Sequence, residues 1–315
     1  MGSPSAERWL RERTFHHSSY EAAWLTERRT QTISICVPAR ECAATVAAVA
    51  APLVALREQG AIDEVLVVDA DSADGTAQIA ANAGATVVQE AELLPSFGPV
   101  AGKGDAMWRA LSVLSGELIA FVDADIEGFT ERFALGLLGP LVENPEISFV
   151  KACYRRPYVV AGVEVADAGG RVNHLLARPA LALAYGELAV IRQPLAGEIA
   201  ARRALLESIP FTTGYGVEIA MLIDAYAAVG LDGIAQVDLG EYRHAHQPLE
   251  ALSEVAYSVL GVLMARMERE GRLTEFNPRS LRAADGTERG ALPIERMPMA
   301  QARAGDRSMQ VAAGA

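Results

Sequence analysis

The sequence predicts an α/β protein with a Rossmann-like, mostly parallel sheet flanked by helices. Three apolar runs of strand length, at residues 33–37, 64–69 and 118–122, predict buried strands. A helical pattern separates the first two runs, as in right-handed βαβ units. The parallel strands should end at one edge of the sheet, which is where open α/β sheets bind their ligands.

The elements follow one another from about residue 31. The first strand, 33–37, is closed by Pro38, and the second ends at Asp69 before a polar turn. The other expected elements are helices over 45–58, 76–83, 217–229 and 249–267, a helix beginning near residue 105, and strands over 86–89 and 234–239. Their alternation supports one parallel sheet with ligands at its carboxyl edge.

The triplet Asp123-Ala124-Asp125 directly follows the strand run 118–122. Strand alternation would point positions 123 and 125 the same way. Two hard carboxylate ligands on one side suit Mg²⁺ or Mn²⁺ carrying a diphosphate. A solvated acidic turn would give the same three letters, so the triplet alone leaves both interpretations open.

Composition limits the class of protein. The 315 residues are 51% hydrophobic, enough to bury a sizeable core, and the net charge of -12 argues against binding nucleic acid or a membrane surface. Three cysteines without paired spacing, and no apolar run near membrane-spanning length, favour a reduced, cytoplasmic protein. We expect an N-terminal extension (1–30), a nucleotide-sugar half (31–150), a smaller acceptor-binding half (151–270) and a flexible tail (271–315).

Several motifs, taken together and in order, resemble a known family. They are Val37-Pro38-Ala39, the turn 69–76, Gly102-Lys103-Gly104, Asp123-Ala124-Asp125, Phe149-Val150-Lys151 with Tyr154-Arg155-Arg156-Pro157, Gly169-Gly170-Arg171-Val172, Gln193-Pro194-Leu195, Gly197-Glu198, Gly214-Tyr215-Gly216-Val217-Glu218 and His244. The set resembles retaining glycosyltransferases of the GT-A fold. More narrowly, it is similar to the glucosyl-3-phosphoglycerate synthase family and its actinobacterial mannosyl-3-phosphoglycerate synthase members.

The resemblance implies a role for each matching residue. The implied donor-binding residues are Pro38, Ala39, Glu41, Asp69, Lys103, Asp123, Ala124 and Tyr215. The implied catalytic residues are Asp123, Asp125, Leu195 and Glu218, and the implied ligands of Mg²⁺, Mn²⁺ or Co²⁺ are Asp125, Glu218 and His244. The implied acceptor-binding residues are Gly170, Arg171, Asn173 and Arg243. Glycines that let the backbone approach and a guanidinium that binds bidentately suit a phosphorylated acid.

This chain departs from the family's pattern at several positions. Glu41 stands one position before the expected glutamate, and Ala70 replaces a serine at the nucleobase. Asn173 replaces a threonine, and Tyr242 replaces an arginine that Arg243 then follows. The changes at the base are compatible with GDP, so we expect GDP-mannose as the favoured donor, with GDP-glucose or UDP-glucose as alternatives.

The expected reaction moves the hexose, with retention, to the 2-hydroxyl of D-3-phosphoglycerate in a homodimeric enzyme. Two other functions remain open at the level of sequence. A polyprenyl-phosphate sugar transferase would share the GT-A half but would need a membrane segment. A nucleotide-sugar sensor would bind the donor without turnover, although the presence of Lys103, Asp123, Asp125, Glu218 and His244 argues against it.

Overall fold

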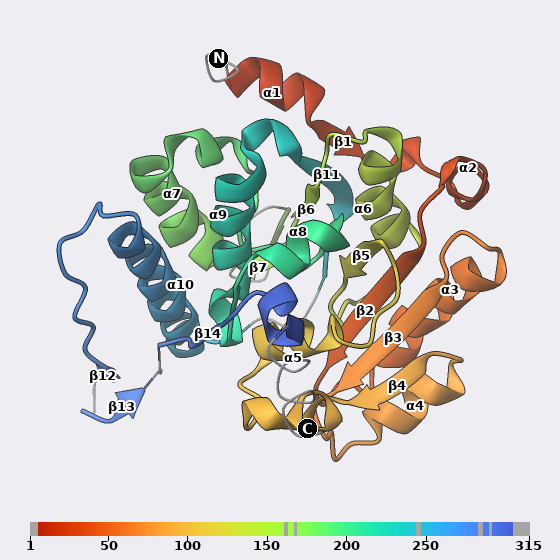
Figure 1. The fold of residues 1–315 in the computed structure, drawn as a ribbon, viewed down its shortest axis with the longest axis horizontal. Coiled ribbons are helices and arrows are strands. Elements are labelled where there is room, and N and C mark those ends of the chain that lie inside the picture. Colours follow the sequence, from red (N-terminus) through yellow and green to blue (C-terminus); the bar gives the residue numbers. More distant parts are fainter. Residues whose placement is uncertain are drawn as a thin grey trace, which may run out of the picture.

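The computed structural model describes residues 6–160, 163–166, 169–243, 247–282, 286–289 and 292–304. Its centre is an eight-stranded sheet in the order β1-β11-β6-β9-β5-β2-β3-β4. These strands are β1 (Thr14–His16), β2 (Ile33–Ala39), β3 (Glu64–Asp69), β4 (Thr86–Gln89), β5 (Leu118–Phe121), β6 (Phe149–Arg155), β9 (Ile199–Arg202) and β11 (Ile234–Glu241). Figure 1 shows the sheet surrounded by helices.

The sheet is mostly parallel, as predicted. Only β9 runs antiparallel to both of its neighbours, β5 and β6, whereas the other pairs in this sheet are parallel. The carboxyl ends of β2, β3 and β5 therefore meet at one edge. That edge carries Asp69 and the turn beginning at Asp123, which confirms the Rossmann-like arrangement.

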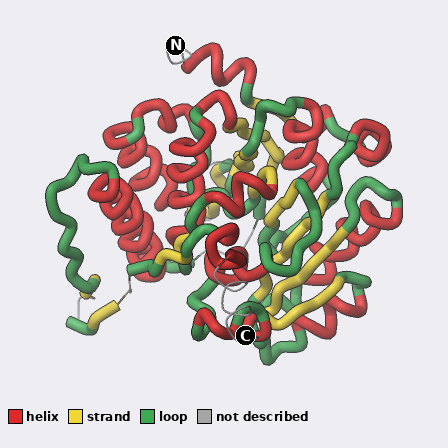
Figure 2. Tube along the Cα trace, viewed as in Figure 1, coloured by secondary structure: helices red, strands yellow, loops and turns green. Residues whose placement is uncertain are grey.

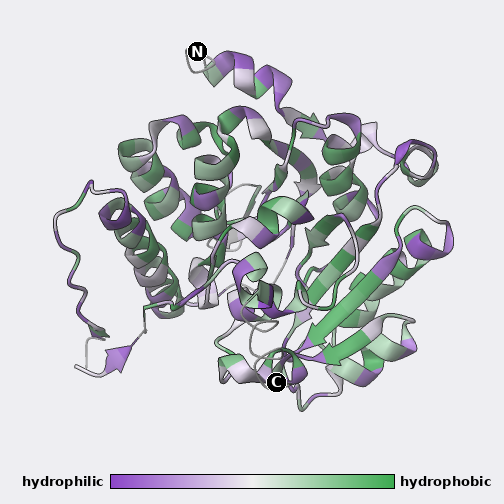
Figure 3. Cartoon of the chain, viewed as in Figure 1, coloured by the Kyte–Doolittle hydropathy of each residue, from purple (hydrophilic) through white to green (hydrophobic). Residues whose placement is uncertain are grey.

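Helices cover both faces of the sheet, as Figure 2 shows. Side chains alternate along β2, so Ile33 and Ile35 join one core while Cys36 joins the other. The first core packs against α2 (Ala22–Arg28), α3 (Val46–Glu58), α4 (Thr76–Asn82) and α6 (Arg132–Glu143). The second packs against α1 (Ala6–Glu12), α5 (Lys103–Ala110), α7 (Arg178–Ala184), α8 (Arg203–Ser208), α9 (Val217–Val229) and α10 (Leu249–Arg269). The central strands are accordingly hydrophobic along their length (Figure 3).

From Ala6 onward the described N-terminal residues are part of the fold, whereas the sequence predicts a separate N-terminal extension over 1–30. Strand β1 pairs with β11 at the edge of the sheet. Trp9 of α1 is only 1% exposed, and its indole nitrogen donates to the carbonyl of Leu231 at 3.0 Å. Burial of one large aromatic residue and one sheet pairing anchor this segment.

The C-terminal residues also differ from the predicted flexible tail. After α10, the short strands β12 (Leu281–Arg282) and β13 (Glu288–Arg289) pair with each other, and β14 (Glu295–Arg296) pairs with β10 (Phe211–Thr212). Met299 is fully buried. Residues 292–304 thus pack against the core, because a strand pairing and a buried methionine fix a segment whose composition alone looks loose. The remaining strands are β7 (Tyr158–Val160) and β8 (Val163–Val165). Within the described ranges, no helix has the length and apolar character needed to cross a bilayer.

Candidate functional site

Lys103 joins two acidic segments at the carboxyl edge of the sheet. Helix α5 begins at Lys103, after Gly102 with a φ of 79°, a backbone conformation that favours glycine. The Lys103 ammonium lies 2.5 Å from Oδ1 of Asp123, which follows β5, and 3.0 Å from Oε1 of Glu218, in the first turn of α9. Three distant stretches of chain therefore meet at one cation, as the predicted donor and catalytic residues require.

Electrostatics keep this lysine charged. Burial alone would lower the pKa of Lys103, but the carboxylates of Asp123 and Glu218 outweigh it and raise that pKa above its ordinary value. Gly197 packs directly against the pair. A Cβ at Gly197 would lie 2.4 Å from Oδ2 of Asp123 and 2.6 Å from Nζ of Lys103, so only a glycine leaves room for this contact.

The loops after β2 and β3 are tied together beside Asp69. Glu41, in a left-handed conformation with a φ of 52°, accepts from the Ala73 N–H at 2.9 Å, and its own N–H donates to Ser72. Oδ2 of Asp69 accepts from the Ser72 N–H at 3.0 Å and from Gln89 at 3.1 Å. Oδ1 of Asp69 is buried and has no hydrogen-bond partner among the described residues. A buried acceptor of this kind favours a ligand N–H.

Three of the four predicted acceptor residues, Gly170, Arg171 and Asn173, line one cavity of about 170 Å³. Its lining consists of Arg156, Gly170, Arg171, Val172, Asn173, Leu195, Tyr215, Gln247, Leu252 and Val255. Two guanidiniums in one small cavity suit a ligand with more than one negative charge. The Arg171 guanidinium donates to the Gln247 carbonyl at 2.7 Å and lies 5.0 Å from the Tyr158 ring centroid, which fixes its orientation.

Two short stretches of chain connect the cavity with the lysine site. Leu195 lines the cavity two residues before Gly197, and Tyr215 lines it three residues before Glu218. Asn173 is buried, and its amide donates to the Arg192 carbonyl at 3.3 Å and accepts from the Leu195 N–H at 3.4 Å. Asn173 therefore holds the loop that joins the two sites.

One predicted acceptor residue is not brought into the cavity. Arg243 is absent from its lining and pairs with Glu241, with Nε 2.6 Å from Oε1. His244, the third expected metal ligand, lies outside the described residues. Pro38 and Ala39 lie at the end of β2, and Ala39 is 4% exposed, so they shape the edge beneath the Asp69 loop.

Comparison with known proteins decides the family. Residues 34–172 match the model of glycosyl transferase family 2. The chain is 41% identical over 268 residues to a glucosyl-3-phosphoglycerate synthase of Petrotoga mobilis, covering 83% of this chain and 82% of that protein. It is 42% identical over 260 residues to the Mycolicibacterium smegmatis protein of the same name, covering 82% and 86%. The chain belongs to the glucosyl-3-phosphoglycerate synthase family.

Solved structures in the family have the same fold. The mannosyl-3-phosphoglycerate synthase of Rubrobacter xylanophilus superposes with a TM-score of 0.87 at 42% identity, covering 96% of this chain and 99% of that one. The Mycobacterium tuberculosis glucosyl-3-phosphoglycerate synthase, in complex with Mn²⁺, UDP-glucose and phosphoglyceric acid, has a TM-score of 0.82 at 36% identity, covering 92% and 99%. These relatives confirm the GT-A fold and show that this chain is a hexosyltransferase.

The acidic residues of this family member suit a hard divalent cation. Partial burial and the neighbouring Asp123 carboxylate raise the pKa of Asp125, so a cation at this point would relieve an unfavourable charge. The Ala124 carbonyl accepts from the Thr45 hydroxyl at 2.7 Å, which fixes the turn between the two aspartates. The described part of the chain contains no preformed group of three His, Cys, Asp or Glu ligands.

Buried polar residues close to Asp123 also support the site, a role that the sequence motifs did not reveal. Glu198 is fully buried, and its Oε2 accepts from the Tyr154 hydroxyl at 2.8 Å. Burial, and then the charge of Asp123, raise the pKa of Glu198 to about 7. Lys151, also fully buried, donates to the Ala196 carbonyl at 2.7 Å. Lys103 and Lys151 are the chain's only two lysines, and both serve this region. Arg156 also lines the cavity, and its guanidinium lies 4.8 Å from the Tyr242 ring centroid.

Proposed function

We propose that this enzyme transfers a hexose from a nucleoside-diphosphate sugar to the 2-hydroxyl of D-3-phosphoglycerate, with retention of the anomeric configuration. The observation that carries the proposal is the cavity lined by Arg156 and Arg171, because two of its other lining residues, Leu195 and Tyr215, stand two and three positions before Gly197 and Glu218 of the lysine site. A phosphorylated carboxylic acid supplies the several negative charges that two guanidiniums bind. The acceptor would thus lie next to the leaving diphosphate.

The donor would occupy the carboxyl edge of the sheet. The Lys103 ammonium, at the N-terminus of α5, is placed to neutralise a donor phosphate, and helix N-termini favour phosphate oxygens. The free Oδ1 of Asp69 would accept an N–H of the base. We assign donor contacts also to Pro38, Ala39, Glu41 and Ala124. Glu41 already accepts from Ala73, so its contribution is to shape the base loop.

A divalent metal completes the proposal. Asp125 and Glu218, with His244 as the third ligand, would hold Mn²⁺ or Mg²⁺, which neutralises charge on the leaving diphosphate when bound. The support is the set of hard oxygen ligands here and the Mn²⁺ named in the complexes of the M. tuberculosis relative. Glu218 would have to release its ion pair with Lys103 before its carboxylate could bind the metal.

For the chemical step we propose front-face attack. The acceptor 2-hydroxyl forms the new bond to the anomeric carbon on the face from which the diphosphate leaves, and its proton passes to the departing phosphate oxygen. Lys103 would stabilise the charge that develops on that diphosphate. Trapping a hexosyl ester on any carboxylate of the enzyme would contradict this mechanism.

Two donors are supported by different observations. We propose GDP-mannose as the preferred donor, supported by the departures at Glu41 and Ala70 and by the likeness to the R. xylanophilus mannosyl enzyme. UDP-glucose is the second candidate, because the related sequences from P. mobilis and M. smegmatis are glucosyl enzymes and the M. tuberculosis structure contains UDP-glucose. Mannose and glucose differ in one hydroxyl orientation, so few contacts decide between them.

A donor matrix tests both proposals. Purified enzyme is incubated with D-3-phosphoglycerate, Mn²⁺ or Mg²⁺, and GDP-mannose, GDP-glucose, UDP-glucose or UDP-mannose in parallel, and the released nucleotide and phosphorylated glycoside are measured. Highest kcat/KM with GDP-mannose supports the mannosyl assignment, and highest kcat/KM with UDP-glucose replaces it. Absence of turnover with all four donors would refute the acceptor assignment and favour a polyprenyl-phosphate acceptor or a sensor.

Two wider assignments complete the proposal. We propose a homodimer, which a monomeric mass in solution would contradict, and a cytoplasmic location without nucleic-acid or membrane partners, supported by the net charge of -12. We also keep Arg243 as an acceptor-binding residue that would have to leave Glu241. An unchanged acceptor KM in Arg243→Met would exclude that role.

A further inference from the structure

Residues 292–304, here called the C-terminal strap, cross the molecule beside the donor site. The strap follows α10 and leads through β14 toward α5 (Figure 1). The indole of Trp108, in α5, donates to the Met297 carbonyl at 2.8 Å. On the other side, the Thr213 N–H donates to the Ile294 carbonyl at 2.8 Å, one residue before the Gly214–Gly216 turn. The strap therefore contacts two of the three segments that meet at Lys103, namely α5 and the turn that leads to Glu218.

One strap residue pairs with the first turn of the lysine helix. Arg296 Nε lies 2.8 Å from Oδ1 of Asp105, and its Nη2 lies 2.8 Å from Oδ2, a bidentate pair. Asp105 is fully buried two residues after Lys103. Arg296 also donates to the carbonyls of Phe97 at 2.9 Å and Pro99 at 3.3 Å. It thus holds the chain that enters α5 as well as the helix itself.

The pairing extends to the opposite side of the lysine site. Oδ2 of Asp105 also accepts from the Ala101 N–H at 2.9 Å, and the Ala101 carbonyl accepts from the Gly214 N–H at 3.1 Å. Gly214 opens the turn that carries Tyr215 and leads to Glu218. A series of hydrogen bonds therefore links Arg296 to the two chain segments that carry Lys103 and Glu218.

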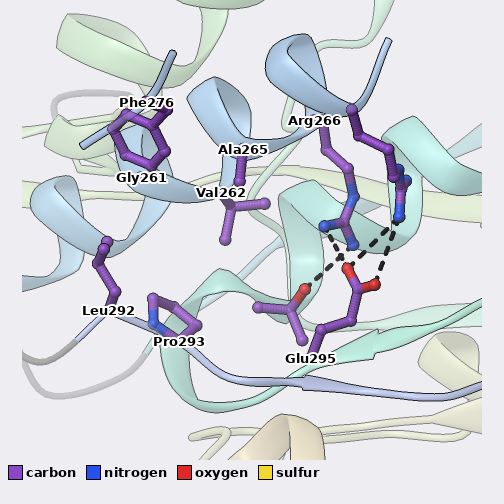
Figure 4. Close-up of a pocket in the computed structure, with 10 residues that line it drawn as sticks. Gly261, Val262, Ala265, Arg266, Phe276, Leu292, Pro293 and Glu295 are labelled. Carbon is purple, nitrogen blue, oxygen red and sulfur yellow. Dashed lines mark hydrogen bonds and ion pairs between the residues drawn. The ribbon is translucent and has the colours of Figure 1, made fainter. Parts of the chain in front are cut away.

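The neighbouring strap residue points the other way and fastens the strap to α10. Glu295 pairs with Arg266 and lies 3.4 Å from Arg269, at the charged end of a cavity of about 270 Å³ (Figure 4). Arg266 also lies 2.7 Å from Asp224, so chain carboxylates satisfy the guanidiniums here. The ion pairs of Glu295 therefore attach the strap to α10, whereas Arg296 makes the contact toward the donor site.

We infer that Arg296 is a positioning residue for the donor: it holds Asp105 and the 97–102 entrance so that Lys103 lies between Asp123 and Glu218. This role of Arg296 rests on the proposed function, in which Lys103 binds a donor phosphate. Arg109 Nε lies 3.3 Å from Asp105 and remains when Arg296 is replaced, so a variant at position 296 keeps a partner for the buried carboxylate.

The test compares four variants of the full chain. Arg296→Met removes the pair, Arg296→Lys restores the charge without the bidentate geometry, and Glu295→Gln weakens only the attachment to α10. Arg282→Met, which breaks an exposed pair with Glu288 at 2.9 Å, is the matched control. For each, we measure the melting temperature, the KM of donor and acceptor, and the Kd of GDP and UDP with Mn²⁺ by calorimetry.

We expect Arg296→Met to raise the donor KM and the nucleotide Kd about tenfold while the acceptor KM stays within twofold, with partial recovery in Arg296→Lys. Glu295→Gln should lower the melting temperature without that selective change. Wild-type nucleotide affinity in Arg296→Met, or an equal rise in donor KM in Glu295→Gln, would overturn the inference. If the wild type binds nucleotide but does not use 3-phosphoglycerate, the proposed acceptor fails, and the nucleotide Kd values still decide the role of Arg296.

Discussion

The ammonium of Lys103 lies 2.5 Å from Oδ1 of Asp123, and a Cβ at Gly197 would overlap both side chains. The pair joins the helix after the glycine-rich entrance to the acidic turn after β5. Glu218 completes the arrangement from α9, 3.0 Å from the same nitrogen. Donor phosphate binding, the acidic turn and the loop leading to the acceptor cavity are therefore coupled at one point.

Replacing Gly197 tests this coupling. In Gly197→Ala the new methyl group would overlap Asp123 and Lys103, so at least one of these two side chains must move. A displacement near 1 Å at such a site lowers activity about 100-fold, and we expect kcat/KM to fall by that order. Gly186→Ala is the control, because its Cβ would meet nothing within 4 Å. Equal activity of the two variants in a steady-state assay would show that the close contact is unimportant.

Arg171 should bind the acceptor rather than the donor. Arg171→Gln removes a positively charged guanidinium from the 170 Å³ cavity. We expect the KM for 3-phosphoglycerate to rise about 10- to 100-fold, with little change in the KM for the nucleotide sugar. Arg178→Gln, on the exposed surface of α7, is the matched control. A rise confined to the KM for the nucleotide sugar would show that Arg171 binds the donor and not the acceptor.

Stability should depend on pH through Glu90. Burial, and then the nearby Asp105 carboxylate, raise the pKa of Glu90 from 4.5 to about 7. Between these values the folded protein keeps a proton that the unfolded chain has lost, so this group's contribution to stability falls as pH rises. Glu90→Gln should therefore melt above wild type at pH 8 and close to it at pH 4.

The comparison for Glu90 uses its exposed neighbour in the same turn. Glu92→Gln should leave the pH dependence of the melting temperature unchanged. A melting curve for Glu90→Gln that follows wild type across pH 4–8 would show that Glu90 is solvated in the fold.

The N-terminal helix should contribute to global stability. Trp9→Ala removes a side chain that is 1% exposed and its hydrogen bond to Leu231, and such changes cost about 3–5 kcal/mol. Urea unfolding measures this loss directly. A change below about 0.5 kcal/mol would mean that α1 detaches without affecting the domain.

The sequence predicted the elements that depend on local pattern. The strand from Glu64 to Asp69 and the helix from Val217 to Val229 have the expected bounds, because apolar periodicity and terminal residues specify them. The helix expected near Asp105 begins two residues earlier, at Lys103, where the glycine conformation at position 102 allows it to start. The resemblance placed Lys103, Asp123 and Glu218 in one site, and the structure brings them together.

Contacts between distant segments could not be predicted in this way. The strap was predicted to be flexible because its arginines and prolines are typical of solvent-exposed segments. In the structure, however, Arg296 pairs with a buried carboxylate 191 positions away in the chain. Arg156 likewise has no local pattern that places it in the cavity. Such pairings depend on the three-dimensional approach of two elements, which neither periodicity nor motif spacing encodes.

The most direct test of the central claim is an acceptor comparison. Purified enzyme with Mn²⁺ and an equimolar mixture of GDP-mannose and UDP-glucose is given D-3-phosphoglycerate, D-2-phosphoglycerate or glycerol 3-phosphate, and the products are identified by NMR. We expect a 2-O-hexosyl-3-phosphoglycerate with retained anomeric configuration as the dominant product. Equal turnover with acceptors that lack the carboxylate or the 2-hydroxyl, or an inverted glycoside, would contradict it.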